Sequence, residues 1–357
     1  MKILYCYKHG ILGGVCTQLY HRFRGHVDEQ LEIHCLFNKD HGVAEMLGEF
    51  ATIHFGIRGE DMAEFVIEQE FDAIVVIDSP EYFKMLKEVE HKSKVFLEVH
   101  TSIFKNLEYL RQIERSDIDG IITVSEYMIE IIQERLSEEC SQLSINKFSN
   151  VLDTDLFNLE TSRERKSKVP LLWIGKIDDH KDWKTFFKIC QALNSNSKDR
   201  EFWLVGGQTC APKLAQEVFD KALELGILSQ LHWIDRIENE NMSRIYSYVA
   251  KNGGCKLITS HNESFGMSAL ESMLSGCPVV SSRVGALPEI SDTGAHFMLY
   301  ELQNVDQATK LIIQMNSDKG MREANDALIQ VNSKLVEEFS SNKRSIDYWN
   351  MMKVMVG

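Results

Sequence analysis

The chain has 357 residues, which is more than one ordinary hydrophobic core accommodates, so the length predicts roughly two domains. An apolar content of 44% and a charged content of 26% are typical of folded globular proteins and exclude a disordered chain. The formal net charge of −14 argues against a nucleic-acid partner and against broad adhesion to anionic lipid, because both require a dense positive surface. An anionic ligand would therefore need a local basic pocket.

Short runs of β-branched and aromatic residues alternate with stretches of helical length along the whole chain. In the first half, the predicted strands are Lys2–Tyr7, Leu31–Phe37, Ala51–Phe55, Ala73–Asp78, Lys94–His100, Gly120–Val124 and Ser144–Phe148. In the second half, they are Leu171–Gly175, Phe202–Val205, Leu231–Ile234, Lys256–Thr259, Pro278–Ser281 and His296–Tyr300. Several runs are apolar at every position, as parallel strands are when helices cover both faces of a sheet. The alternation predicts an α/β fold with two doubly wound, Rossmann-like domains.

The domain boundary is expected at a charged stretch near the middle of the chain, Glu160–Lys168, which Pro170 follows. The stretch Asp326–Met355 has the pattern of an amphipathic helix. The expected parts are the domains 1–160 and 161–335 and a C-terminal helix, 336–357, that crosses back to the N-terminal domain. Ligands of open α/β sheets bind beyond the carboxyl ends of the strands, so the two domains are expected to face each other across a cleft that holds the site.

The chain has no apolar run of 18 residues and no signal-peptide pattern at its start, which predicts a cytoplasmic protein. Its eight cysteines include no C-x-x-C pair and mostly lie in apolar surroundings, as reduced, buried side chains do. His34, Cys35 and His41 have no further ligand at a usual zinc spacing. We therefore expect neither a disulfide framework nor a zinc site.

The most informative segment runs from Glu263 to Glu271, where two carboxylates bracket a glycine that opens a predicted helix. The first N–H groups of a helix, here around Gly266 and Met267, attract anions because no backbone carbonyl satisfies them and the helix dipole is positive there. Carboxylates only accept hydrogen bonds and would bind hydroxyl groups. A sugar nucleotide carries both phosphate and hydroxyl groups. Taken alone, the two glutamates could equally be solvated surface residues.

Further segments follow a recognisable order along the chain. They are Gly13-Gly14 after the first strand, Thr123-Val124-Ser125 before a helix, Ser149–Phe157, Ile174–Lys181, Glu263–Glu271 with Gly276 and Pro278, and Gly285–Ile290. Together they resemble the retaining GT-B glycosyltransferases of family 4, whose hallmark is an E-x7-E motif. The chain departs from that family at Lys176, where an arginine is usual, and at Val151, where a glycine is usual.

The resemblance implies a nucleotide-sugar site in the C-terminal domain and an acceptor site in the N-terminal domain. Lys176 and Lys181 would neutralise the diphosphate, although lysines in a charged loop are ordinarily solvated. Glu263 would bind hydroxyls of the donor sugar and Glu271 those of the ribose. The remaining donor-binding positions would be Ser264, Phe265, Gly266 and Met267 for phosphate and sugar, and Arg236 and Ile237 for the nucleobase.

Two features of the N-terminal domain gain a role from the same resemblance. His100 would meet the donor sugar, although a lone histidine at a strand end is more often structural. The Gly13-Gly14 turn would let backbone N–H groups approach the phosphate or the acceptor, although a plain tight turn explains it as well.

The implied activity is transfer of a hexose from UDP-, GDP- or ADP-hexose to a hydroxyl of a small-molecule, glycan or protein acceptor, with retention of configuration. The departing phosphate would take the acceptor proton, without a metal or another cofactor. Asp153-Thr154-Asp155 looks like a metal-binding D-x-D motif, but its position between domains argues against that role. A hydrolase or epimerase using Glu263 and Glu271 as an acid–base pair, and a non-catalytic binding module, are the alternatives.

The acceptor is expected to contact loops of the N-terminal domain at Gly10–Arg24, Gly56–Asp61 and Ser102–Arg115, which carry no recognisable code. The last of these mixes basic and apolar residues and could touch a membrane or an acidic acceptor, but a solvated helix is the favoured interpretation.

Overall fold

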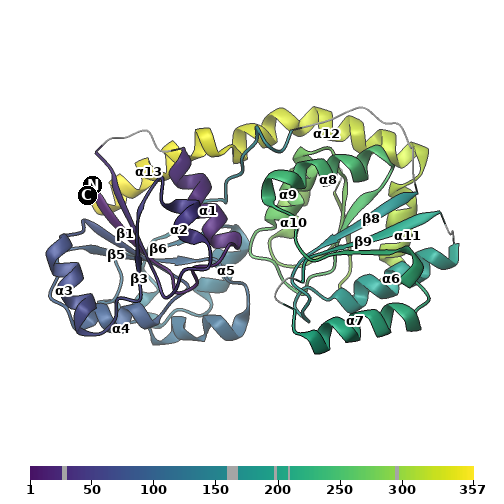
Figure 1. Cartoon of the computed structure of the whole chain (residues 1–357). Helices are drawn as coiled ribbons and strands as arrows, with labels where there is room; N and C mark the ends of the chain where they lie inside the picture. Colours follow the sequence, from purple (N-terminus) through teal and green to yellow (C-terminus); the bar gives the residue numbers. More distant parts are fainter. Residues whose placement is uncertain (26–29, 159–167, 197–198, 208–209, 294–296) are drawn as a thin grey trace. The chain divides into compact units, whose positions relative to one another are not determined.

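The computed structural model describes residues 1–25, 30–158, 168–196, 199–207, 210–293 and 297–357 (Figure 1). The chain forms two compact units. Unit 1 comprises Met1–Asp153 together with Phe339–Gly357, and unit 2 comprises Thr154–Glu338. Most of the predicted linker Glu160–Lys168 lies outside the described residues. Each unit is an α/β layer structure with its own hydrophobic core.

Unit 1 contains a seven-stranded, wholly parallel sheet with the strand order β3-β2-β1-β4-β5-β6-β7. The strands are β1 (Lys2–Cys6), β2 (Glu32–Phe37), β3 (Thr52–Phe55), β4 (Ala73–Ile77), β5 (Lys94–Val99), β6 (Gly120–Thr123) and β7 (Ile145–Lys147). The helices are α1 (Gly14–Arg24), α2 (Val43–Leu47), α3 (Glu60–Gln69), α4 (Glu81–Lys87), η1 (Phe104–Gln112), α5 (Glu126–Gln133), η2 (Glu138–Cys140) and α13 (Ser341–Val356). All seven strands predicted for this half are confirmed, each end within one residue.

The end of the chain completes the core of unit 1. Helix α13 packs beside α1, and Tyr348, Trp349 and Met352 are buried among side chains of the sheet and of α1 and α2 (Figure 1). The central strand β4 is buried at every position, as expected for a parallel strand with helices on both faces.

Unit 2 contains a six-stranded parallel sheet with the order β10-β9-β8-β11-β12-β13. The strands are β8 (Val169–Ile174), β9 (Arg200–Val205), β10 (Leu231–Ile234), β11 (Cys255–Ile258), β12 (Val279–Ser282) and β13 (Phe297–Tyr300). The helices are α6 (Trp183–Asn196), α7 (Pro212–Glu224), η3 (Leu228–Gln230), α8 (Asn239–Lys251), α9 (Met267–Leu274), α10 (Leu287–Ser291), α11 (Val305–Met315) and α12 (Asp318–Phe339). All six predicted strands are present, although His296, the predicted start of the last one, lies outside the described residues.

The two sheets share one topology, in which the chain starts at a central strand and the order reverses beside it. The reversal lies between β1 and β4 in unit 1 and between β8 and β11 in unit 2. In unit 2, α6 and α7 cover one face of the sheet and α8 and α9 cover the other (Figure 1). In such sheets, ligands bind at the carboxyl ends of the strands beside the reversal.

Three local predictions need correction. The predicted helix Asp326–Met355 is two helices with a break at Ser340, because the backbone of Leu152 forms hydrogen bonds on both sides of the break. The N–H of Leu152 donates to Phe339 O and its carbonyl accepts from Ser341 N, each at 2.8 Å. Pro170 lies inside β8, one residue before that strand begins to pair with β11. Most of the predicted acceptor loop at the start of the chain is helix α1.

The mixed basic and apolar stretch after β5 folds as the 3₁₀ helix η1. Leu107 and Leu110 are fully buried, so they face the core of unit 1 and offer no apolar surface to a membrane. Phe104 remains 47% exposed, with the Arg135 guanidinium 4.6 Å from its ring centroid. In the described part of the chain, no helix combines the length and the apolar character needed to cross a bilayer.

Candidate functional site

Two loops meet where the strand order of the unit 2 sheet reverses. The first follows β8 and carries Lys181, and the second follows β11 and carries Glu263. Their side chains form an ion pair with Lys181 Nζ 2.5 Å from Glu263 Oε1. The hydroxyl of Ser260 donates to the same oxygen at 2.6 Å. The structure thus brings together two predicted site residues that are 82 positions apart in the sequence.

The electrostatics of this pair favour its charged form. Burial raises the pKa of Glu263, but the Lys181 ammonium and the hydrogen bonds from Lys181 and Ser260 outweigh burial and hold the pKa below its usual value. Lys181 keeps 27% and Glu263 18% of its side chain exposed. Within the described residues, the second carboxylate oxygen of Glu263 has no partner, and Lys181 spends one of three N–H groups on Glu263. The pair can therefore offer a cation and an acceptor to one ligand.

Hydrogen bonds between the two loops fix the position of this pair. The hydroxyl of Thr259 donates to the carbonyl of Lys181 at 2.7 Å and accepts from Trp173 Nε1 at 2.8 Å. The backbone N–H of His261 donates to the carbonyl of His180 at 2.8 Å. These hydrogen bonds hold the two loops together, so the position of the ion pair does not depend on flexible side chains alone.

The segment Gly285–Ile290 supports the Glu263 loop. Ala286 N donates to Glu263 O at 2.9 Å. Gly285 has φ +55°, and a Cβ atom at this position would lie 2.1 Å from Glu263 O. Only glycine combines that backbone conformation with such a close approach.

Helix α9 begins at the predicted glycine. Gly266 has φ +106°, and a Cβ atom there would lie 2.8 Å from Leu287 and 3.0 Å from Ile290. All residues from Ala269 to Leu274 are buried. Among the other predicted donor-binding residues, Phe265 is buried, and Ser264 and Met267 are half-buried.

Glu271 lies in a buried environment that the sequence pattern did not predict. It is 9% exposed and accepts a hydrogen bond from Tyr246 Oη at 3.0 Å. Lys256 of β11 is fully buried nearby, with Nζ 5.4 Å from the Tyr246 ring centroid and no hydrogen-bond partner among the described residues. Burial raises the pKa of Glu271 and lowers the pKa of Lys256 to about 7. The available signal for Lys256 was a lysine at the first position of a predicted strand, directly before the apolar Leu257 and Ile258.

Other predicted residues of unit 2 lie at the same edge of the sheet but do not join the ion pair. Lys176, two residues after β8, is exposed, and its ammonium has no partner in the described part of the chain. Arg236 follows β10 and pairs with Glu238 at 3.0 Å in solvent, beside the half-buried Ile237.

In unit 1, the Gly13-Gly14 turn follows β1 and begins helix α1. Gly13 has φ −140°, an extended conformation that any residue adopts. A Cβ atom at Gly14 would meet nothing within 4 Å, and one at Gly13 would lie 3.8 Å from Ile11. Neither the backbone nor the packing of the described residues therefore requires glycine at these positions.

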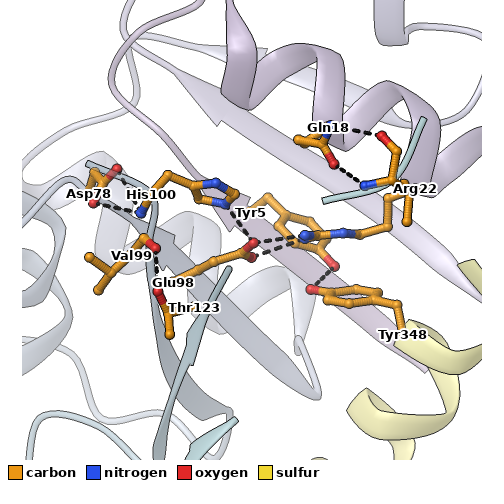
Figure 2. A network of polar contacts seen from close by, with 10 residues as sticks. Tyr5, Gln18, Arg22, Asp78, Glu98, Val99, His100, Thr123 and Tyr348 are labelled. Atoms are coloured by element: carbon orange, nitrogen blue, oxygen red, sulfur yellow. Dashed lines mark hydrogen bonds and ion pairs between the residues drawn. The ribbon is translucent and has the colours of Figure 1, made fainter. Parts of the chain in front are cut away.

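His100 follows the end of β5 and belongs to a buried polar network (Figure 2). Its Nε2 lies 2.7 Å from Glu98 Oε1, and both side chains are largely excluded from solvent, at 8% and 0% exposure. Arg22 of α1 donates to both Glu98 oxygens, at 3.0 and 2.8 Å. The Arg22 guanidinium lies 3.9 Å from the ring centroid of Tyr348, whose hydroxyl is 2.9 Å from that of Tyr5.

The charges of this network compensate one another. Burial raises the pKa of Glu98, but Arg22 and His100 outweigh burial and lower the pKa to about 2. The sequence predicted His100 but not Arg22 or Glu98. The available signal was a glutamate inside the apolar strand Lys94–His100.

The backbone around His100 is held by Asp78, which follows β4. Its carboxylate accepts from His100 N at 3.1 and 3.2 Å and from Thr101 N at 2.9 Å. Asp78 has φ +43°, a conformation that aspartate tolerates better than most residues. Burial raises the pKa of this carboxyl group to about 6.

The candidate metal motifs take other roles. Asp153 forms an ion pair with Arg24 at 2.5 Å, and His34 lies between Glu32 and His54, at 2.7 and 2.9 Å. Among the described residues, no group of three histidine, cysteine or acidic side chains has the geometry of a metal site.

Part of the chain is similar to proteins of a known family. Residues 157–331 match the family model "Glycosyl transferases group 1". D-inositol 3-phosphate glycosyltransferase of Corynebacterium diphtheriae is 28% identical over 37% of this chain and 31% of that protein. A probable sucrose-phosphate synthase of Thermosipho melanesiensis is 23% identical over 57% of this chain and 45% of that protein. The matches to the first three curated relatives cover 31%, 61% and 45% of their lengths.

Solved structures match over the whole chain. Anabaena Alr3699/HepE in complex with UDP-glucose has a TM-score of 0.81 at 14% identity, covering 99% of this chain and 100% of that chain. Sucrose-phosphate synthase from Thermosynechococcus elongatus has a TM-score of 0.79 at 13% identity, covering 99% and 98%. At such identities the likeness shows the fold, and it confirms the predicted GT-B class with two Rossmann-like units.

Proposed function

We propose that the chain is a hexosyltransferase that uses a nucleotide-diphosphate sugar, because residues 157–331 match the family model for group 1 glycosyl transferases. The observation that carries the proposal is the Lys181–Glu263 ion pair at the strand-order reversal of unit 2. An ammonium group at that position attracts a diphosphate, and the carboxylate beside it accepts hydrogen bonds from sugar hydroxyls.

The chemistry follows from this placement. When the bond between the anomeric carbon and the phosphate breaks, negative charge builds on the diphosphate. Lys181 stabilises that charge without rearrangement, because Glu263 and the loop already fix its position. Lys176, exposed at the same sheet edge, would add a second positive charge. We propose that the transfer retains the anomeric configuration, that the departing phosphate takes the acceptor proton, and that no metal or other cofactor takes part.

The further donor contacts are assigned by the family resemblance. Glu271 would bind the ribose hydroxyls, and residues from Ser264 to Met267 the phosphate and sugar. Arg236 and Ile237 would lie beside the base, and His100 with Gly13-Gly14 would contribute from unit 1. UDP-glucose is the first donor to test, because the Anabaena structure with the same fold is a complex with it. The acceptor could be a small molecule, a glycan or a protein.

The cellular location proposed is the cytoplasm. All eight cysteines are free, and seven of them are buried, as in proteins of a reducing compartment.

The test compares Lys181→Met and Glu263→Gln with Lys184→Met. Lys184 is an exposed lysine on α6 that pairs with Asp179 and Glu217, so its loss should leave the site intact. UDP, UDP-glucose, GDP and ADP binding is measured by calorimetry, and nucleotide release is followed with a panel of hydroxyl acceptors. We expect turnover at least about 100-fold lower for the two site variants, as for loss of one transition-state contact, and little change for the control.

Two outcomes would decide against the proposal. Equal consumption of sugar nucleotide with and without acceptor would favour the hydrolase alternative. Unchanged binding and turnover in both site variants would favour a non-catalytic module or another site.

A further inference from the structure

The position of His100 is determined by groups that are too deeply buried to touch a ligand. Glu98 and His100 are two residues apart at the end of β5, so their side chains leave the strand on the same face. Glu98 Oε1 lies 2.7 Å from His100 Nε2, and Asp78 holds the His100 backbone from the other side (Figure 2). Both the backbone and the ring of His100 are therefore held.

Glu98 itself cannot rotate away from His100 without breaking a buried ion pair. Arg22 donates to both of its oxygens, and Oε1 accepts from Arg22 Nη2 and His100 Nε2 together. The Arg22 guanidinium packs over the ring of Tyr348, and it lies 5.6 Å from the ring centroid of Phe148. This clamp, which consists of Arg22, Glu98 and Tyr348, joins α1, β5 and α13, three elements that are far apart in the sequence (Figure 2).

The clamp also decides which ring nitrogen carries the proton. An ionised carboxylate only accepts hydrogen bonds, so the nitrogen that faces Glu98, Nε2, must be the N–H. Nδ1 has no hydrogen-bond partner among the described residues. In the neutral ring Nδ1 is a bare acceptor, which suits a hydroxyl donor.

We propose that Glu98, clamped by Arg22, is a positioning residue that fixes the Nε2–H tautomer of His100 and leaves Nδ1 to accept a hydrogen bond from a sugar hydroxyl. This inference rests on the proposed function, because it takes the ligand to be a sugar nucleotide. It assigns a role to two residues that contact no substrate.

The first test is spectroscopic and does not depend on activity. Nitrogen NMR of the ¹⁵N-histidine-labelled chain distinguishes protonated from bare ring nitrogens, and His100→Asn identifies the His100 signals by their absence. At a pH where the ring is neutral, we expect Nε2 to be protonated and Nδ1 bare. A predominant Nδ1–H tautomer in the unmodified chain would overturn the inference.

The second test uses paired variants that avoid an unpaired buried charge. In Arg22→Met/Glu98→Leu the ion pair is removed whole and Nε2 loses its acceptor, whereas Arg22→Met/Glu98→Gln keeps an amide oxygen within reach of Nε2. We expect the first variant to lose the single tautomer and about 10- to 100-fold in kcat/KM for UDP-glucose, by analogy with metal-bound histidines that lose their orienting partner. The glutamine variant should recover most of both.

UDP affinity separates this inference from the proposed function. UDP lacks the sugar, so its affinity should be the same in both double variants. Two results would overturn the positioning role. One is a loss of kcat/KM that Arg22→Met/Glu98→Gln does not restore. The other is a single tautomer with unchanged kcat/KM in Arg22→Met/Glu98→Leu. An unmodified chain that neither binds nor consumes any sugar nucleotide would refute the proposed function, and the tautomer would then decide the positioning role alone.

Discussion

The buried ion pair between Arg22 and Glu98 makes a strong prediction about the stability of unit 1. Arg22→Met removes the two hydrogen bonds to Glu98, at 3.0 and 2.8 Å, and leaves a carboxylate with 0% exposure. Removing one partner of a buried pair costs about 3–5 kcal/mol, because the other charge stays behind unpaired. The pKa of Glu98 agrees in direction, because Arg22 and His100 lower it from 4.5 to about 2 in spite of burial.

The pH dependence of this contribution has a definite sign. A carboxyl group whose pKa is lowered by folding stabilises the folded state above its unfolded pKa, and the contribution disappears as the pH falls. For Glu98 it is complete above about pH 4.5 and is lost towards pH 2. The difference in stability between the unmodified chain and Arg22→Met should therefore shrink as the pH falls through this window.

The assay is urea unfolding at pH 7, followed by tryptophan fluorescence, in which Trp349 is the only reporter in unit 1 and the other four tryptophans report on unit 2. A loss of about 3–5 kcal/mol corresponds to a fall in Tm of roughly 6–20 °C for a domain of this size. Arg24→Met is the matched control on the same helix, because Arg24 is 48% exposed and surface pairs contribute at most about 1 kcal/mol. The reasoning would be refuted if Arg22→Met lowered the free energy of unfolding by less than about 1 kcal/mol. It would also be refuted if Arg22→Met/Glu98→Leu were no more stable than Arg22→Met.

Three further perturbations test other parts of the structure. Gly285→Ala should lower Tm and weaken UDP binding, because the added methyl would lie 2.1 Å from Glu263 O. Calorimetry measures the affinity, and an unchanged Tm and affinity would contradict the close approach. Burial lowers the pKa of Lys256 from 10.5 to about 7, so the unfolded chain holds more protons and stability rises with pH between these values, by up to about 1.4 kcal/mol per unit. Lys256→Met should lack this rise in urea midpoints measured at pH 7 and 9, and equal slopes in the two chains would argue against the lowered pKa of Lys256. Burial raises the pKa of Asp78 from 3.8 to about 6, so its contribution to stability falls as the pH rises through that window. Asp78→Asn should remove this fall in urea midpoints measured between pH 4 and 7. A pH profile that Asp78→Asn leaves unaltered would count against the raised pKa.

Much of the secondary structure and the edge of the sheet that carries the site followed from local patterns. A parallel strand with both faces covered is apolar at every position, so runs such as Ala73–Ile77 were recognisable without any tertiary information. Parallel strands also place all of their carboxyl ends at one edge, but it was the family resemblance that assigned Lys181 and Glu263 to one site. The break at Ser340 was not recognisable, because it depends on the backbone of Leu152, which is distant in the sequence.

The sequence by itself determined the class of fold and which loops carry charged groups, because the periodicity of apolar residues and the turn residues are local properties. Only the tertiary structure decided the partners of those groups. It placed Lys181 on Glu263 and Arg22 on Glu98, and it buried Lys256 and Glu271. The physical reason is that a buried charge is stable only beside a compensating group, and the fold supplies that group from positions that no local pattern connects.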